Sequence, residues 1–93
     1  MAGMAAEASF PITDRSRRFG YVIWPSSQDA AMREVLGGTD AAEVVLNGTP
    51  IGQHRIDWKH RRISVGRKRT EGLREGSFAI TRDDQGRVQV TLR

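Results

Sequence analysis

The sequence predicts an α+β fold in which one short helix packs on a curved, mostly antiparallel sheet of about six to seven short strands. Two observations carry this prediction. Hydrophobic residues alternate with polar ones along several short segments that end in glycine, proline or asparagine, as they do in strands. A single segment, residues 26–36, instead repeats its hydrophobic residues at helical spacing. The expected element order is β-α-β-β-β-β-β-β, and so many short strands could close as a small barrel.

The chain has 93 residues, which favours one domain with a small core. Its first eight residues contain no basic region and no long apolar stretch, so we expect no secretory signal. We expect residues 1–14 to form a mobile N-terminal tail and residues 15–93 to form a single α+β domain.

The first expected elements are a strand over residues 18–24 and the helix that follows it. Both faces of this strand are apolar, which is typical of a central strand covered on both sides. Ser26 is expected to cap the helix, and Gly37 is expected to end it in a left-handed conformation. The helix would bury three residues against the sheet, namely Met32, Val35 and Leu36.

The later segments are typical of β-hairpins. Asn47-Gly48 is a strong two-residue turn signal between strands expected at 43–46 and 49–53. Pro50 indicates an edge or a bulge in the second of these strands. Residues 66–76 are expected to form a loop, and a last hairpin is expected over residues 78–92.

In the basic segment between these hairpins, the hydrophobic residues switch from even-numbered to odd-numbered positions. Successive side chains of a flat strand point to opposite faces, so a single flat strand could not keep all of them on one face. A two-residue turn at residues 60–61 would pair Trp58 with Ile63 and Ile56 with Val65, restoring one apolar face. We prefer this hairpin, although these turn residues are poor formers of a type I′ turn. A bulge between Trp58 and Ile63 is the alternative.

Positive charge is concentrated in residues 54–69. Histidines apart, this segment carries seven basic residues and one acidic residue, whereas the rest of the chain carries eight basic and ten acidic residues. The whole chain has a formal net charge of +4. Because the protein is slightly acidic outside one basic segment, the charge distribution predicts a binding face.

The predicted function is non-catalytic binding of nucleic acid or another polyanion through residues 55–69. The cations would meet successive phosphates, and Trp58 or His60 could stack on bases. The predicted site residues are Arg55, Trp58, Lys59, His60, Arg61, Arg62, Arg67, Lys68 and Arg69. Contacts to phosphates carry no sequence information, so we expect little sequence preference.

The same residues have structural interpretations. A charged, solvated hairpin can protect a sheet edge from aggregation, and Trp58 is more often a core residue than a stacking platform. Folding could also scatter the arginines over two faces, or pair several of them with Asp57, Glu71 and Glu75.

Two other functions remain open. A protein-interaction module could dock the basic hairpin on an acidic partner or accept a partner strand at a sheet edge. A small ribonuclease could use His54 and His60 as acid and base, with Lys59 nearby, although we expect no enzyme.

We expect no cofactor and no metal, because the two histidines lack a credible third and fourth ligand. The absence of cysteine favours a reducing compartment and therefore a cytoplasmic location. No run approaches the roughly 18 apolar residues of a membrane span, so we expect no membrane partner.

The order of a helix, Leu46-Asn47-Gly48, Ile51-Gly52 and Ile56-Asp57 weakly resembles the Sm-like RNA-binding barrels. The glycine spacing is contracted here, a strand precedes the helix, and the basic stretch has no fixed counterpart in that family. We therefore carry no family residues over to this chain.

Overall fold

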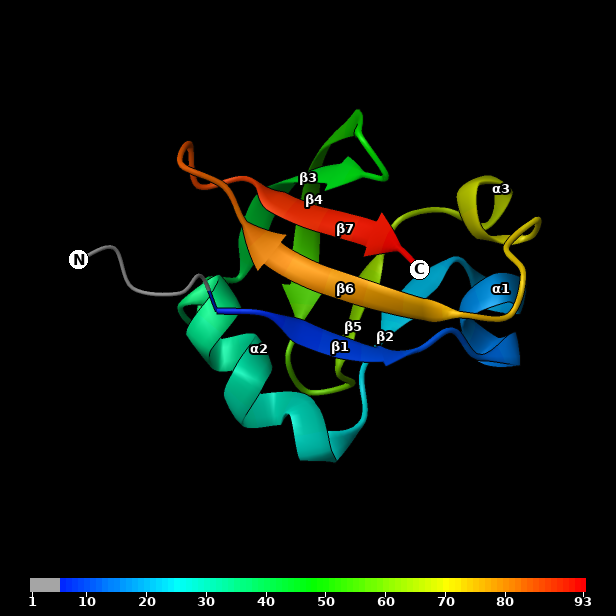
Figure 1. The fold of residues 1–93 in the computed structure, drawn as a ribbon, viewed down its shortest axis with the longest axis horizontal. Coiled ribbons are helices and arrows are strands. Elements are labelled where there is room, and N and C mark those ends of the chain that lie inside the picture. The colour runs from blue at the N-terminus through cyan, green and yellow to red at the C-terminus, as the bar shows by residue number, and fades with distance from the viewer. Residues whose placement is uncertain (1–5) are drawn as a thin grey trace.

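The computed structural model describes residues 6–93. It shows an α+β fold in which short helices border a curled, seven-stranded sheet that forms a half-barrel (Figure 1). The strand order is β1-β6-β7-β3-β4-β5-β2, and all neighbours are antiparallel except β3 and β7. The predicted fold class is confirmed, and β1 and β2 lie at the two edges of the sheet.

The strands are β1 (Ala8–Pro11), β2 (Tyr21–Ile23), β3 (Ala41–Leu46), β4 (Thr49–Asp57), β5 (Arg62–Ser64), β6 (Ser77–Arg82) and β7 (Val88–Leu92). The helices are α1 (Asp14–Phe19), α2 (Asp29–Leu36) and α3 (Arg67–Thr70), with a 3₁₀ turn, η1, at Ser26–Gln28.

The segment expected to be a mobile tail contributes a strand from Ala8 onward. β1 pairs antiparallel with β6, and Phe10 is buried against Phe78 with ring centroids 5.9 Å apart. Ala8, Phe10 and Ile12 alternate inward, which is the period of a strand with one covered face. Small residues around them hid this short pattern in the sequence, and residues 1–5 lie outside the described part of the chain.

The strand expected over residues 18–24 begins only at Tyr21, because a short helix precedes it. The Thr13 side chain accepts a hydrogen bond from the Ser16 amide at 3.2 Å, which caps the start of α1. Gly20, with a φ of 78°, ends the helix. β2 is therefore three residues long, and it lies at the sheet edge, not at the centre as predicted.

The predicted helix is present as α2. Met32, Val35 and Leu36 are buried, and Gly37 ends the helix with a φ of 67°. Ser26 starts the preceding 3₁₀ turn and does not cap α2 through its side chain.

The β3–β4 hairpin has the predicted turn. Asn47 and Gly48 both have positive φ, 48° and 87°, as a type I′ turn requires. Val44 pairs with Gly52 and Val45 pairs with Pro50, so one extra residue of β4 bulges out of the ladder. The bulge that Pro50 indicated is confirmed.

The β4–β5 hairpin is present, but its predicted register is wrong. Ile56 pairs with Ile63 and Asp57 pairs with Arg62, so the turn has four residues, 58–61, and not two. The Asp57 side chain accepts the His60 backbone N–H at 3.0 Å, which stabilises this longer turn. Trp58 therefore lies in the turn and does not form the predicted pair with Ile63 of β5.

The β6–β7 hairpin matches the prediction and buries Phe78, Ile80, Val88 and Val90 in the core. The expected loop over residues 66–76 instead starts with α3. Its Thr70 is buried and donates its hydroxyl hydrogen to the Arg17 carbonyl at 3.1 Å. No helix in residues 6–93 is long and apolar enough to cross a membrane.

Candidate nucleic-acid interface

The structure distributes the predicted site residues over two elements. The β4–β5 hairpin carries Arg55, Trp58, Lys59, His60, Arg61 and Arg62, and α3 carries Arg67, Lys68 and Arg69. The hairpin residues divide again, because some face a cleft beside β2 and others face α2. The basic segment is therefore not a single uniform surface.

A cleft of about 420 Å³ lies beside the edge strand β2, and we call it the hairpin cleft. Its lining residues are Tyr21, Arg55, Asp57, Lys59, His60, Arg62 and Ser64. The Arg62 guanidinium carbon lies 4.3 Å from the centroid of the Tyr21 ring, within cation–π range. Within residues 6–93, Arg55 and Lys59 form no ion pair, so their charge is available to a ligand.

Asp57 neutralises part of the positive charge in the hairpin cleft. Its carboxylate accepts the His60 backbone N–H and lies 2.9 Å from His60 Nδ1 and 3.6 Å from Arg62 Nε. The hydrogen bond from the His60 backbone and then the one from its ring lower the pKa of Asp57, although burial opposes them. Asp57 is therefore an anion at neutral pH.

The tip of the hairpin is attached to α2. Arg61 Nε contacts both Asp29 carboxylate oxygens, at 3.0 and 2.9 Å, and the Trp24 indole donates to the same carboxylate at 2.8 Å. The hydrogen bond from Trp24 and then the one from Arg61 hold the pKa of Asp29 below its usual range. Arg61 therefore stabilises the fold by holding the hairpin tip to α2.

The Trp58 side chain is likewise held by contacts within the fold. Its indole donates to the Thr39 carbonyl at 2.7 Å, and its ring packs edge-to-face on Trp24 with centroids 5.5 Å apart. The Arg33 guanidinium lies 5.3 Å from the ring centroid. These contacts support the core interpretation of Trp58 over the stacking one.

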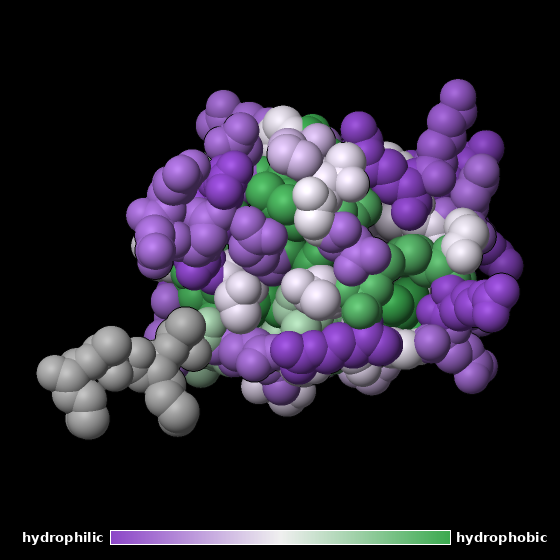
Figure 2. Space-filling view, turned by 45° about the horizontal axis from the view of Figure 1, so that its top comes forward, coloured by the Kyte–Doolittle hydropathy of each residue, from purple (hydrophilic) through white to green (hydrophobic). Residues whose placement is uncertain are grey.

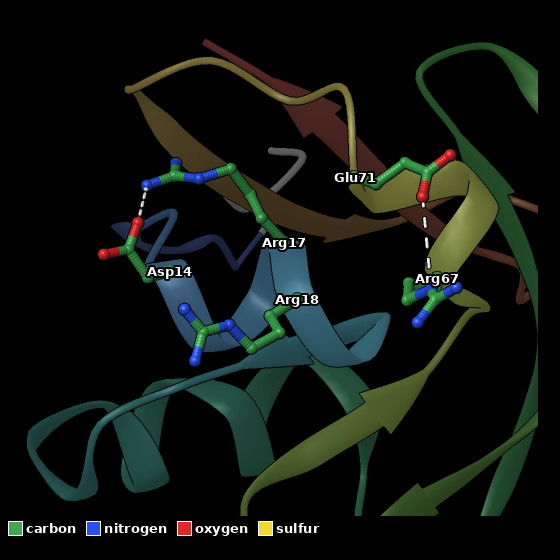
Figure 3. Close-up of a pocket in the computed structure, with 5 residues that line it drawn as sticks. All are labelled: Asp14, Arg17, Arg18, Arg67 and Glu71. Atoms are coloured by element: carbon green, nitrogen blue, oxygen red, sulfur yellow. Dashed lines mark hydrogen bonds and ion pairs between the residues drawn. The ribbon is translucent and has the colours of Figure 1, made fainter.

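A second basic cluster lies between α1 and α3, around a cleft of about 390 Å³ that we call the helix cleft (Figure 3). It is lined by Asp14, Arg17, Arg18, Arg67 and Glu71. Arg17 pairs with Asp14, and Arg67 lies 4.0 Å from Glu71. Figure 3 draws no hydrogen bond or ion pair between Arg18 and the other four residues. Arg17 Nη1 is buried and has no hydrogen-bond partner within residues 6–93.

Gly20 brings the two sides of the helix cleft together. Its carbonyl accepts hydrogen bonds from the amides of Val65 and Gly66, at 2.8 and 3.2 Å. A Cβ at Gly20 would lie 2.3 Å from the backbone nitrogen of Arg67, so only glycine allows this approach.

Two further basic residues of α3 are not among the residues that line the helix cleft. Arg69 donates to the Val65 carbonyl at 2.8 Å and lines a groove of about 260 Å³ with Leu46, Ile51 and Leu92. Lys68 is exposed and forms no ion pair within residues 6–93.

The two histidines have separate partners. His54 Nε2 lies 3.0 Å from the Ile51 carbonyl, and His60 contacts Asp57. In the described part of the chain, no three or more His, Cys, Asp or Glu side chains gather in a way that could hold a metal ion.

Sequence reasoning did not include the arginines of α1 in the site. Arg15, Arg17 and Arg18 follow one another closely, and that short basic run was a usable signal. The run was divided, because Arg18 was assigned to a covered strand while Arg15 and Arg17 lay between the expected tail and that strand.

A scan of protein-family models, a search of curated proteins and a search of solved structures each found no match to this chain.

Proposed function

We propose that this chain is a non-catalytic domain that binds nucleic acid through the hairpin cleft, the helix cleft and the exposed Lys68, which follows Arg67 of the helix cleft on α3. The observation that carries the proposal is the pair of basic clefts themselves. One contains Arg55, Lys59 and Arg62, and the other contains Arg18 and Arg67.

Cations that are exposed and lack an acidic partner can release counterions from a phosphate backbone when they bind it. Arg18, Arg55, Lys59 and Lys68 meet this condition within residues 6–93. Arg61 is not part of the proposed surface, because Asp29 neutralises it. The absence of cysteine supports action in a reducing compartment such as the cytoplasm.

The test is fluorescence anisotropy with labelled single-stranded RNA, single-stranded DNA and duplex DNA, each across a salt series. We expect micromolar binding at low salt that weakens steeply as salt rises. Lys59→Glu and Lys68→Glu, tested separately, should each weaken binding several-fold and lower the salt slope by about 0.7 to 0.9.

The matched control is the double variant Ala30→Glu/Gln85→Glu. It changes the net charge by the same two units as a single Lys→Glu change, at exposed positions on α2 and on the β6–β7 turn. The control should bind like the parent. Binding of no nucleic acid at low salt, or equal loss in the control, would contradict the proposal.

A protein-interaction module is the second candidate, and one observation favours it. Residues 49–55 of β4 pair with β3 on one side only, because pairing with β5 is confined to Ile56 and Asp57. This edge adjoins the groove lined by the half-buried Leu46, Ile51 and Leu92. Figure 2 shows hydrophobic atoms visible between polar side chains across the middle of one face. A protein that co-purifies with the chain without nucleic acid, and is lost on Ile51→Glu, would favour this candidate.

A further inference from the structure

Phe19 is the one large hydrophobic side chain that residues 6–93 leave exposed. Its relative exposure is 54%, whereas the core side chains around the half-barrel are below 10%. Phe19 is the last residue of α1, directly before the glycine turn that leads into β2. An isolated exposed hydrophobic side chain needs no explanation by itself, so its surroundings decide what it means.

The surroundings of Phe19 are aromatic and cationic. Its ring stacks on Tyr21, with centroids 6.2 Å apart and planes inclined by 27°. Tyr21 in turn lines the hairpin cleft and lies beneath the Arg62 guanidinium. Arg18, the residue before Phe19, lines the helix cleft. The aromatic pair therefore connects the two basic clefts, because Tyr21 lines the hairpin cleft and Phe19 directly follows a residue that lines the helix cleft.

We propose that Phe19 and Tyr21 form a stacking platform for an unpaired base and that the chain prefers single-stranded nucleic acid to duplex. This inference rests on the nucleic-acid binding proposed above and specifies its substrate class. The strand would place one phosphate in the helix cleft and another in the hairpin cleft, with the base between them on Phe19.

The chemistry of a single strand matches this arrangement. Proteins that bind single strands combine cations that follow the backbone with exposed aromatic faces on which bases stack. In a duplex the bases are already stacked and paired, so the phosphates would be bound but the Phe19 ring would gain nothing.

The experiment compares the parent with Phe19→Leu and Phe19→Tyr. Each protein is titrated with labelled twelve-nucleotide oligo(rU), oligo(dT) and a duplex of the same length, at one low salt concentration. Leucine keeps a hydrophobic side chain but removes the aromatic face, and tyrosine restores that face. Because the ring is exposed, all three proteins should have the same thermal unfolding midpoint to within a few degrees.

We expect the parent to bind both single strands more tightly than the duplex. Phe19→Leu should weaken single-strand binding about 5-fold or more without changing duplex binding, and Phe19→Tyr should match the parent. Single-strand binding that is unchanged in Phe19→Leu, or tighter binding of the duplex, would overturn the inference while leaving nucleic-acid binding intact. Absence of binding to all three probes would instead overturn the proposed function itself.

Discussion

The hairpin tip, residues 58–61, and the α1–α3 corner, residues 14–20 and 66–71, are both rich in cations but use them differently. At the tip, Arg61 contacts Asp29, and Trp58 donates to the Thr39 carbonyl. At the corner, Arg18 and Lys68 form no ion pair within residues 6–93, and the two acids present pair with other arginines.

Because of this difference, a high density of positive charge in a sequence does not by itself identify the cations that are free to bind a ligand. The tip lies within the most basic stretch of the chain, yet its arginine stabilises the attachment of the hairpin to α2. The corner recruits arginines from α1, outside that stretch, and leaves part of their charge available. Variants that separate effects on folding from effects on binding therefore test whether the tip and the corner differ in this way.

The largest effect is expected for Gly20→Ala at the corner. The new Cβ would lie 2.3 Å from Arg67 N and 2.5 Å from Gly66 C, and φ is 78°. Backbone must move to accept it, so we expect a loss of about 3 kcal/mol or more in the free energy of unfolding, measured in urea.

Gly38→Ala is the matched control, because Gly38 has a φ of 74° but nothing within 4 Å of the added Cβ. It should lose only the backbone cost of about 1–2 kcal/mol. Equal losses for the two variants would show that the α1–α3 contact at Gly20 contributes nothing beyond backbone conformation.

A smaller effect is expected for Trp58→Phe at the tip. Phenylalanine keeps an aromatic ring against Trp24 but removes the 2.7 Å hydrogen bond to the Thr39 carbonyl. We expect a loss of about 1 kcal/mol in the free energy of unfolding, with oligonucleotide affinity unchanged. A large loss of affinity at unchanged stability would instead assign Trp58 to the binding surface.

The tip should also respond to acid. Hydrogen bonds from Trp24 and then Arg61 lower the pKa of Asp29 in the folded state below its ordinary value. Such a group stabilises the fold above its unfolded pKa, and the contribution is lost as the pH falls through the folded pKa. The Tm of the parent should exceed that of Asp29→Asn by a constant amount above about pH 5.

Below about pH 5 this difference in Tm should shrink, because first the unfolded state and then the folded protein binds a proton at the carboxylate. Circular dichroism melts between neutral and acidic pH measure it directly. A difference that persists unchanged in strong acid would mean that the charge of Asp29 does not hold the tip.

The smallest effect on stability is expected for Arg55→Ala and Lys59→Ala. Both side chains are exposed and form no ion pair within residues 6–93, so each change should alter the free energy of unfolding by no more than about 0.5 kcal/mol. Oligonucleotide binding should nevertheless weaken in both. A substantial loss of stability would instead mean that these side chains, like Arg61, stabilise the fold.

The sequence predicted the elements whose signals are local. Asn47-Gly48 and Gly37 set their turns through their own backbone preferences, and alternation in the last hairpin identified its core face. α1 was missed because it buries a serine, Ser16, instead of a hydrophobic stripe, and only its two caps define it.

Contacts between residues that are far apart in the sequence could not be predicted from such local signals. In the β4–β5 hairpin, Trp58 does not pair with Ile63 but contacts the Thr39 carbonyl, nineteen residues away in the sequence. Which of the predicted site residues keep a free charge could not be read from the sequence, because Arg61 pairs with Asp29, thirty-two positions earlier. Pairing with acids was foreseen in general, and Asp57 and Glu71 are two of the partners found.

The most direct test of the difference between tip and corner is the salt dependence of single-strand binding. The logarithm of the association constant is measured against the logarithm of salt concentration for the parent, Arg61→Ala and the double variant Arg18→Ala/Lys68→Ala. We predict that the double variant lowers the magnitude of the slope by about 1.4, at roughly 0.7 per lost phosphate contact, and that Arg61→Ala leaves the slope unchanged. An unchanged slope in the double variant, with a reduced slope in Arg61→Ala, would contradict the account.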